Sequence, residues 1–401
     1  MKILQINTTV NSGSHGRIAE DIGRVLMLNG HESYIAFGRG NLFSSSETIK
    51  IGGTLDVRLH VLKSRLLDMH GFGSAGATKS FIDKVKAIDP DIIHLHNIHG
   101  YYINVGLLFN YLKEAGKPVV WTFHDCWPFT GHCSYFDAVN CYKWEMECNK
   151  CPNIKAYPRS FFIDNSRKNF NRKKELFKSI RNLTIVTPSH WLADHVKRSF
   201  LKECPVRVIY NGIDISIFRP VKISAGKPQY SSYGKYILGV ASKWDRRKGL
   251  ADFVKLRKLL PVETNVVLVG LKPGQISGLP EGIIGVERTN NMEELASLYS
   301  GALVFVNPTY VDNFPTTNIE ALACGTPVIT YNTGGSPEAI DETTGSIVKK
   351  GNIKELYVEI EKINIKGKDY YEGFCRKRAE KLFNNEHLYN EYIKLYTHLL
   401  A

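Results

Sequence analysis

Two acidic residues eight positions apart, Asp312 and Glu320, are the side chains whose type and spacing best suit chemistry. An apolar run from Ala302 to Val306 ends at Asn307, which predicts a buried strand followed by a loop. A helix is expected to begin near Thr316 and to carry Glu320. The free N–H groups and positive dipole end of such a helix start suit a diphosphate, while carboxylates suit sugar and ribose hydroxyls.

The same residues have a plainer interpretation. Thr317 and Glu320 have the spacing of a capping box, in which both side chains satisfy the helix's own first amides. Asp312 is a common turn residue. The segment taken alone leaves both interpretations open, so the rest of the chain has to decide between them.

Further motifs follow one another in a recognisable order. They are Gly30-His31-Glu32, Thr122-Phe123-His124-Asp125, Pro188-Ser189-His190-Trp191, Asn211-Gly212-Ile213-Asp214 with Phe218, Lys248-Gly249, and Gly334-Gly335-Ser336-Pro337-Glu338. Together with residues 307–327, they resemble the retaining nucleotide-sugar glycosyltransferases of family 4 (glycosyl transferases group 1), of the bacterial surface-polysaccharide type. The resemblance covers residues 1 to roughly 350. One departure is that Asp312 stands where the family's Glu-x7-Glu motif has its first glutamate.

The resemblance implies an α/β chain with the GT-B fold. This fold has two doubly wound Rossmann-like domains facing a cleft, and a C-terminal helix that returns to the N-terminal domain. Apolar runs alternate with helical segments along the chain, which independently predicts parallel βαβ units. We expect an acceptor-side domain at 1–210 with a cysteine-rich insertion at 126–152, a linker at 211–233, a nucleotide-sugar-binding domain at 234–384, and the returning helix at 385–401.

Continuous runs of Val, Ile and Leu indicate strands buried on both faces. The predicted strands are Lys2–Ile6, Tyr34–Phe37, Ile92–Leu95, Val119–Phe123, Thr184–Thr187 and Arg207–Tyr210 in the first sheet, and Tyr236–Ala241, Asn265–Val269, Ile283–Val286, Leu303–Asn307, Pro327–Tyr331 and Ser346–Val348 in the second.

The resemblance also suggests site residues. His124 closes a motif whose histidine contacts the transferred hexose, and Lys243 and Lys248 would neutralise a leaving diphosphate. Lys243 replaces the usual arginine, so it offers a point charge where the family has a planar fork. The predicted catalytic residues are His124, Asp312, Lys243 and Lys248, and the predicted donor-binding residues are Gly16, Asn313, Phe314, Pro315, Thr316, Thr317 and Glu320. The alternatives are an ordinary turn at Gly16 and a solvated basic turn at the lysines.

The implied reaction moves a hexose-type sugar, with retention, from a nucleoside-diphosphate donor to a glycan or polyprenyl-diphosphate-linked glycan. It needs neither a catalytic metal nor an enzymic nucleophile. The setting would be surface-polysaccharide synthesis, of capsule or lipopolysaccharide. Two alternatives remain: a GT-B nucleotide-sugar 2-epimerase, and a basic nucleic-acid-binding protein on a nucleotide fold. We expect no nucleic-acid partner, because the chain carries no recognised nucleic-acid motif.

Composition and charge point to a cytoplasmic protein that is peripheral on the inner membrane. The chain has 401 residues and a net charge of +13, but no apolar run near the roughly 20 residues that a membrane helix needs. Residues 1–10 do not have the pattern of a signal peptide. Lys155 to Arg181 holds nine basic and two acidic residues interleaved with four phenylalanines, which suits an anionic membrane surface. The alternative is a solvated helix face with its phenylalanines in the core.

Five cysteines lie between residues 126 and 151, and a cytoplasmic location makes structural disulfides unexpected. Cys133, Cys141, Cys148 and Cys151 would form a closed four-thiolate zinc site of the structural kind. Such a site would hold together a loop that lacks a core of its own. The alternative is a set of free thiols packed as small apolar groups.

Overall fold

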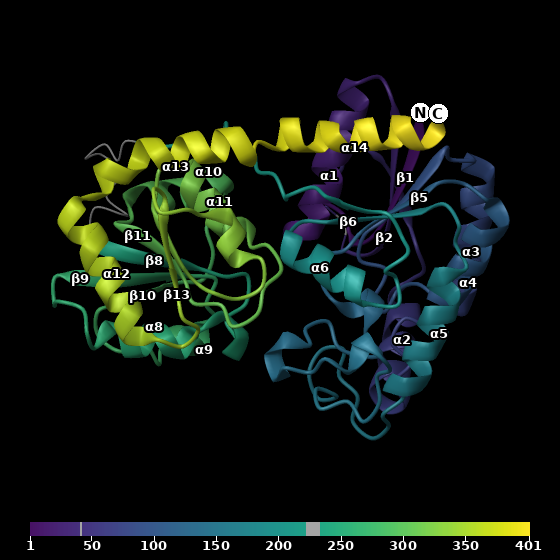
Figure 1. The fold of residues 1–401 in the computed structure, drawn as a ribbon, viewed down its shortest axis with the longest axis horizontal. Helices are drawn as coiled ribbons and strands as arrows, with labels where there is room; N and C mark the ends of the chain where they lie inside the picture. The colour runs from purple at the N-terminus through teal and green to yellow at the C-terminus, as the bar shows by residue number, and fades with distance from the viewer. Residues whose placement is uncertain (41, 222–232) are drawn as a thin grey trace. The chain divides into compact units, whose positions relative to one another are not determined.

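The computed structural model of the protein describes residues 1–40, 42–221 and 233–401. They form two compact units: Met1–Tyr210 with Tyr389–Ala401 make unit 1, and Asn211–Leu388 make unit 2. Residues 222–232 of the predicted linker lie outside the described residues. Each unit has one parallel sheet with helices packed on it, which confirms the predicted α/β class with two doubly wound domains (Figure 1).

Unit 1 contains a seven-stranded sheet with the order β3-β2-β1-β4-β5-β6-β7. The strands are β1 (Lys2–Thr9), β2 (Glu32–Arg39), β3 (Glu47–Lys50), β4 (Ile92–Leu95), β5 (Val119–Thr122), β6 (Leu183–Thr187) and β7 (Val206–Val208). The helices are α1 (Gly13–Leu28), α2 (Thr54–Leu67), α3 (Ala75–Ile88), α4 (Val105–Ala115), α5 (Ser166–Lys178) and α6 (His190–Arg198). The strand order changes direction between β1 and β4, and open α/β sheets bind ligands at the carboxyl ends of strands at such a point.

Local sequence explains where these helices begin and end, as α4 illustrates. The Asn104 side chain accepts a hydrogen bond from the Leu107 amide at 3.1 Å, which caps the first turn. Gly116 ends the helix in the left-handed region with φ of 63°. Between these two residues the apolar positions recur every three or four residues, so α4 buries one continuous face.

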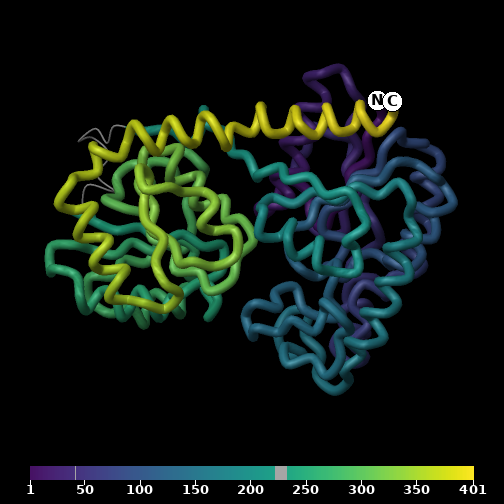
Figure 2. Tube along the Cα trace, viewed as in Figure 1, coloured from purple at the N-terminus to yellow at the C-terminus, as the bar shows by residue number. Residues whose placement is uncertain are grey.

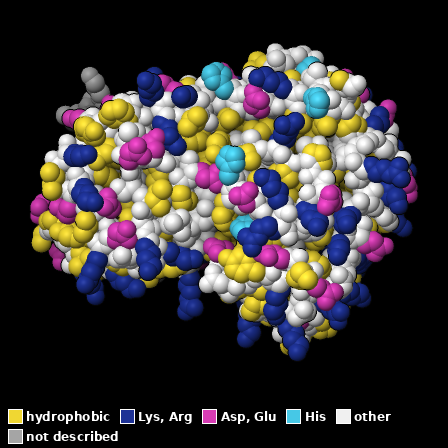
Figure 3. Space-filling model, in the orientation of Figure 1, with side chains coloured by type: hydrophobic (Ala, Val, Ile, Leu, Met, Phe, Trp, Pro, Cys, Tyr) yellow, Lys and Arg dark blue, Asp and Glu magenta, His cyan; other side chains and the backbone are white. Residues whose placement is uncertain are grey.

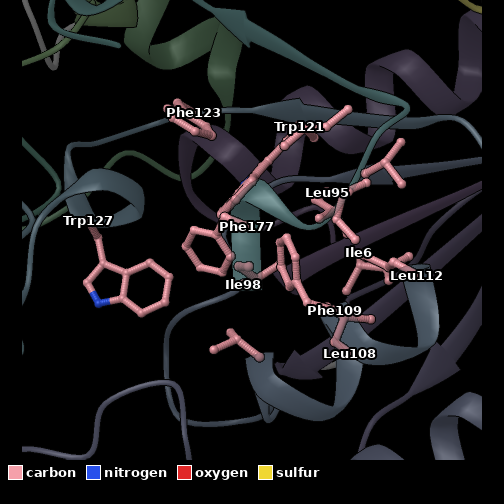
Figure 4. Packing of buried hydrophobic residues seen from close by; sticks show 14 of the residues in the cluster. Ile6, Leu95, Ile98, Leu108, Phe109, Leu112, Trp121, Phe123, Trp127 and Phe177 are labelled. Carbon is pink, nitrogen blue, oxygen red and sulfur yellow. The ribbon is translucent and has the colours of Figure 1, made fainter. Parts of the chain in front are cut away.

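Aromatic side chains fill the core between the sheet and the helices of unit 1 (Figure 4). The Phe177 ring on α5 lies 4.4 Å from the Phe109 ring on α4 and 4.9 Å from the Trp121 ring on β5, between ring centroids. Phe170 is also buried. Half of the phenylalanines in the basic segment therefore belong to the core and not to a membrane-facing surface.

The C-terminal helix α14 (Asn385–Leu400) completes unit 1, in agreement with the predicted returning helix. Tyr389, Tyr392 and Tyr396 are buried on one face of α14. The Tyr392 hydroxyl lies 3.0 Å from Thr122 Oγ1, and the Tyr396 hydroxyl lies 2.7 Å from His94 Nδ1. Residues 389–401, at the end of the yellow trace in Figure 2, thus belong to the N-terminal unit.

Unit 2 contains a six-stranded sheet with the order β10-β9-β8-β11-β12-β13. The strands are β8 (Lys235–Val240), β9 (Thr264–Val269), β10 (Ile283–Val286), β11 (Val304–Asn307), β12 (Val328–Tyr331) and β13 (Gly345–Val348). The helices are α8 (Leu250–Arg257), α9 (Pro273–Ile276), α10 (Met292–Gly301), α11 (Thr316–Ala323), α12 (Ile353–Lys366) and α13 (Lys368–Leu382), with 3-10 turns at η4 (Arg246–Lys248) and η5 (Ser336–Ala339). Here the order changes direction between β8 and β11.

The chain passes between the units twice, and the unit 2 ends of both passages pair with each other. The Ile213 amide donates to Phe383 O at 2.9 Å, and the Asn385 amide donates to Ile213 O at 3.1 Å. Gly212 allows this approach, because a Cβ atom there would lie only 2.5 Å from Asn385 Cα.

Candidate functional site

The loops after β8 and β11 are joined by an ion pair at the switch point of unit 2. Lys248 Nζ on η4 donates to Asp312 Oδ2, and both side chains stay partly open to solvent. Arg247 fixes the same two loops, because its carbonyl accepts from the Tyr310 amide at 2.7 Å and its guanidinium donates to Val311 O at 3.2 Å. Two residues 64 positions apart in sequence thus form one charged site at the carboxyl end of the sheet.

The charge state of this pair follows from its surroundings. Burial alone would raise the pKa of Asp312, but the neighbouring Lys248 and Arg247 cations lower it below its usual value. The carboxylate is therefore ionised at neutral pH. A polyanion that reached this pair would meet a cation already placed by Asp312, and Lys248 could be shared between carboxylate and ligand.

Helix α11 begins beside this pair without a side-chain cap. Its N-cap residue is Pro315, which makes no capping bond, and the first turn contains no acidic residue. The capping box that was the alternative for Thr317 and Glu320 is therefore not what begins this helix. Its orientation is fixed instead by Asn318, whose Oδ1 accepts from Asn307 Nδ2 at 2.7 Å. An uncapped helix start at a switch point is suited to an anionic group.

Glu320 is buried in the middle of α11 and makes a contact that the sequence did not reveal. Its Oε2 accepts the Tyr299 hydroxyl of α10 at 3.0 Å. The backbone carbonyl of Tyr299 also accepts a hydrogen bond from the Thr326 hydroxyl at 2.6 Å. Tyr299 lies in an amphipathic helical run and carried no signal of its own, so only the tertiary structure connects it to the site.

Backbone packing shapes the loop that carries Asp312. Gly334 follows β12 with φ of 55°, and a Cβ atom there would lie 1.7 Å from Asp312 O. The next amide, of Gly335, donates to Asn313 O at 2.8 Å. Asn313, Phe314 and Pro315 are buried, while Thr316 and Thr317 are partly exposed. The predicted donor-binding residues thus divide into a buried frame and an open helix start.

Lys243 is placed differently from Lys248. It is exposed in the loop after β8, three residues before η4 begins. The structure therefore holds one of the two predicted lysines in an ion pair and presents the other to solvent.

In unit 1, histidines gather where β1, β4 and β5 end. His124 is half-buried, and its Nε2 lies 3.1 Å from His96 Nδ1. His96 Nε2 lies 2.9 Å from Gln5 Oε1. The ring of His15, at the start of α1, lies 5.9 Å from the His124 ring. Burial, aided by the other histidines, holds the pKa of His124 well below its usual value, so this imidazole is neutral at pH 7 and able to hydrogen-bond.

Gly16 explains how α1 approaches this histidine group. A Cβ atom at Gly16 would lie 2.9 Å from Thr9 Oγ1, so the first turn of α1 packs directly on the end of β1. The Gly16 carbonyl accepts from the Asn11 amide at 3.2 Å. The glycine therefore has a packing reason to be here, whatever else it binds.

A second polar group in unit 1, formed by buried His99 and Asp125 with Tyr157, was not predicted. His99 Nε2 lies 2.9 Å from Asp125 Oδ2, and His99 Nδ1 lies 3.1 Å from the Tyr157 hydroxyl. Burial would raise the pKa of Asp125, but His99 lowers it below its usual value. Asp125 and His99 both lie just after strands, which was a usable signal, whereas Tyr157 comes from the loop after the cysteines and carried none.

The cysteine-rich loop corrects one expectation, that it lacks a core of its own. Its aromatic rings make a small core, with Trp144 lying 4.8 Å from Phe129 and 4.9 Å from Phe136, so the loop does have a core of its own. Cys133, Cys141, Cys148 and Cys151 line one pocket, but no three or more His, Cys, Asp or Glu side chains among the described residues are placed to hold a metal ion.

The basic segment also differs from its prediction. Lys173 is buried beneath the cysteine-rich loop and donates to Trp127 O at 2.8 Å and to Thr130 O at 3.1 Å. Burial lowers the pKa of Lys173 to about 7. This lysine therefore supports the loop and adds nothing to a charged surface. No described helix is long and apolar enough to cross a membrane.

Comparison with known proteins places this geometry in a class. Residues 15–217 match the family model "Glycosyltransferase Family 4", and residues 227–372 match the model "Glycosyl transferases group 1". The chain therefore belongs to glycosyltransferase family 4, and its two doubly wound units have the GT-B fold.

Individual relatives agree. The chain is 26% identical, over the full length of both sequences, to the "Putative colanic acid biosynthesis glycosyl transferase WcaC" of Escherichia coli (strain K12). Sucrose-phosphate synthase from Thermosynechococcus elongatus has a similar structure, with a TM-score of 0.75 and 20% identity over 100% of this chain and 99% of that one. Anabaena HepE in complex with UDP-glucose gives a TM-score of 0.70 and 15% identity over 99% and 100%.

Proposed function

We propose that this glycosyltransferase moves a hexose-type sugar, with retention, from a nucleoside-diphosphate donor to a glycan or polyprenyl-diphosphate-linked glycan of surface-polysaccharide synthesis. The observation that carries the proposal is the partly open Lys248–Asp312 pair beside the uncapped start of α11. A fixed cation, a carboxylate and free helix amides at one switch point match the phosphates and hydroxyls of a nucleotide sugar.

Unit 2 supplies the electrostatics of bond breaking in this proposal. Negative charge develops on the leaving diphosphate, and Lys248 together with the first amides of α11, at Thr316 and Thr317, stabilises it. Lys243 is the second cation and reaches the phosphates from the exposed loop after β8. Asp312 accepts hydroxyl bonds from the sugar. With this charge stabilised by side chains and amides, the step needs no catalytic metal.

The buried residues around the pair set its geometry. Asn313, Phe314 and Pro315 hold the loop between β11 and α11 in position, and Glu320 is proposed to accept ribose hydroxyls. The Tyr299 hydroxyl occupies one Glu320 oxygen, which restricts the carboxylate to one orientation. A carboxylate held in this way loses little conformational freedom on binding.

Unit 1 is proposed to contribute His124 to the hexose and its Gly16 loop to the ligand. A neutral imidazole suits a hydroxyl-rich ligand because it can both donate and accept a hydrogen bond. We propose no enzymic nucleophile, so the acceptor hydroxyl attacks the same face that the diphosphate leaves. The name of the WcaC relative supports a polysaccharide acceptor, and a lipid-linked one would place the protein at the cytoplasmic side of the inner membrane.

A thermal-shift screen tests the donor half of the proposal. Uridine, guanosine and adenosine diphosphate hexoses are added singly, and the donor is expected to raise the melting temperature because it binds only the native state. UDP-glucose is the first candidate, because HepE has been solved with it. The matched variant Lys248→Ala should lose the shift. If no nucleotide sugar stabilises the wild type, the donor site is wrong.

A structural zinc ion in the cysteine-rich loop stays a prediction. Two observations support it: the four cysteines line one pocket, and the Gly131 amide donates to Cys148 Sγ at 3.2 Å, as backbone amides beside metal-bound thiolates do. Elemental analysis of protein purified without added metal should find one zinc per chain, and a chelator should not abolish transfer. Four titrating thiols and no zinc would show a plain thiol cluster.

A further inference from the structure

Helix α2 in unit 1 exposes its apolar face and buries polar residues, the reverse of an ordinary amphipathic helix. Its leucines at positions 55, 59, 62 and 66 follow the spacing of one helix face, yet they are between 37% and 68% exposed. The residues on its buried face are His60 and Ser64. A stripe of four exposed leucines on one face exceeds the scattered apolar residues that a protein surface normally shows.

Polar contacts explain how the helix can be held in this reversed orientation. His60 Nε2 accepts from the amides of Gly71 and Gly73, both at 3.2 Å, and His60 Nδ1 lies 3.0 Å from Ser74 Oγ. Burial lowers the pKa of His60 to about 3, so the ring stays neutral and can accept these bonds. Hydrogen bonds thus satisfy the inner face, and the leucines stay on the exposed face of α2.

A second apolar segment is tied to the C-terminal end of this helix. The Phe161 amide donates to Arg65 O at 2.8 Å, and Asn165 Nδ2 donates to Leu67 O at 2.7 Å. These bonds place Phe161, Phe162 and Ile163 beside α2, where all three are exposed and Phe162 is 80% exposed. Figure 3 shows Lys and Arg side chains over the end of unit 1 where Figure 1 labels α2 and α5.

The charges around this surface are mainly positive, and the two acids beside it, Asp56 and Asp164, accept hydrogen bonds from backbone amides. Exposed Arg58, Lys63 and Arg65 lie on α2, and exposed Lys155 and Arg159 lie on the approach to Phe161. The Arg159 guanidinium lies 4.7 Å from the centre of the Phe161 ring. The acidic residue of α2, Asp56, is occupied at the helix start, where it accepts from the Gly53 amide at 2.8 Å.

We infer that α2 and residues 161–163 form a docking surface for an anionic lipid bilayer, called here the leucine face. Leucines and phenylalanines rimmed by arginine and lysine are the composition of an element that lies in the headgroup region, with its apolar side against the acyl chains. The surrounding cations add attraction to anionic lipid, and this attraction weakens with salt. A second copy of the chain fits worse, because a symmetric pair would bring the same cations together.

The inference names a surface different from the basic face of α5 and does not depend on the proposed transfer reaction. It gives that reaction a membrane-bound location, which suits a lipid-linked acceptor. Lipid binding is measured without donor or acceptor, so the two hypotheses are tested independently. A negative vesicle result would contradict the leucine face but not the donor site, and a negative donor screen would contradict the donor site but not the leucine face.

Flotation with vesicles tests the leucine face. The full chain is mixed with phosphatidylglycerol–phosphatidylethanolamine vesicles, or with phosphatidylcholine vesicles, at low salt. The wild type should float with the anionic vesicles and stay behind with the neutral ones. Leu59→Gln with Leu62→Gln should reduce the bound fraction at least tenfold, and Phe162→Ser, in an exposed loop, should reduce it severalfold even if the helix variant fails to fold.

Matched controls separate this surface from its rivals. Leu28→Gln removes a leucine on α1 that is 71% exposed, more than Leu59 or Leu62, and this variant should bind as the wild type does. Arg167→Gln with Lys168→Gln and Lys174→Gln neutralises the α5 face and should have a smaller effect than the leucine variants. The inference is overturned if the wild type ignores anionic vesicles, or if only the α5 variant loses binding. A dimer by light scattering that Leu59→Gln with Leu62→Gln converts to a monomer would identify a self-interface instead.

Discussion

The two units place different side chains at the same point of the same sheet order. Of the 13 histidines, all but His387 belong to unit 1, and several lie where β1, β4 and β5 end. At the equivalent switch point, unit 2 has Lys248 and Asp312. Neutral imidazoles are suited to hydroxyl groups, and a fixed cation is suited to phosphate. The shared strand order thus places polar side chains at the equivalent edge of each sheet, and the residue types there suit different chemical groups of a ligand.

The largest expected effect tests the role of the charged pair in unit 2, through substitution of Lys248. Lys248→Ala removes the cation proposed to stabilise the leaving diphosphate, so turnover should fall by roughly 10²–10³-fold, as when one preorganised donor is lost from a charge-stabilising site. Steady-state kinetics with the donor found by thermal shift measure this. Lys243→Ala, at the exposed lysine, should cost less. Equal losses in the two variants would contradict the special placement of Lys248.

A second test uses pH, to which the units should respond differently. Burial lowers the pKa of His60 and of His94 to about 3 each. Below about pH 6.5 these two histidines become protonated in the unfolded chain but stay neutral in the folded protein. The free energy of unfolding of unit 1 therefore falls with pH, by about 2 kcal/mol per such histidine at pH 5. In unit 2, the pKa of Asp312 is lowered, so its contribution disappears only as pH falls through that lowered pKa, below about 4.

Hydrogen exchange read by mass spectrometry at pH 7 and pH 5, corrected for intrinsic exchange rates, measures this difference. Peptides of β4, β5 and α2 should lose protection between these pH values, while peptides of β11 and β12 keep it. Equal loss in both units would show that the buried histidines do not set the acid response.

The smallest expected effect concerns Glu320, whose buried position fits either a donor role or a packing role. Glu320→Gln should weaken donor binding by roughly 1–3 kcal/mol if the carboxylate accepts ribose hydroxyls. Tyr299→Phe removes a hydrogen-bond donor to the same carboxylate and should cost about 1 kcal/mol of stability with little change in donor affinity. Titration calorimetry and thermal melts of both variants separate the roles, and matching behaviour of the two variants would leave Glu320 a packing residue.

Most of the fold was predictable because strands buried on both faces of a parallel sheet have continuous apolar sequences. The twelve predicted strands all overlap strands of the structure, within a few residues at their ends. β3 was missed because its sequence, Glu47-Thr48-Ile49-Lys50, is largely polar and exposed at the sheet edge. An edge strand needs only one neighbour, and the periodicity of its residues carries little signal.

The site was predictable where it follows strand ends and unpredictable where it depends on packing. Lys248 and Asp312 each follow an apolar run, but no sequence pattern shows that they form an ion pair. In α2 the leucines have the spacing of a face that packs in a core, but in the structure this face is exposed. The opposite face is buried, where His60 accepts hydrogen bonds from the amides of Gly71 and Gly73. The cysteine-rich loop builds its small core from aromatic residues at irregular spacing, a pattern that no periodicity rule detects.

The position of α14 has a consequence for synthesis on the ribosome. Residues 1–210 of unit 1 are synthesised before unit 2, but Tyr392 and Tyr396, which contact Thr122 on β5 and His94 on β4, are synthesised after it. The strands that carry His94 and Thr122 therefore lack this cover until residues 389–401 have left the exit tunnel. Unit 1 cannot complete its core before the whole of unit 2 has been made, so its nascent chain exposes apolar surface for longer and is expected to need chaperones.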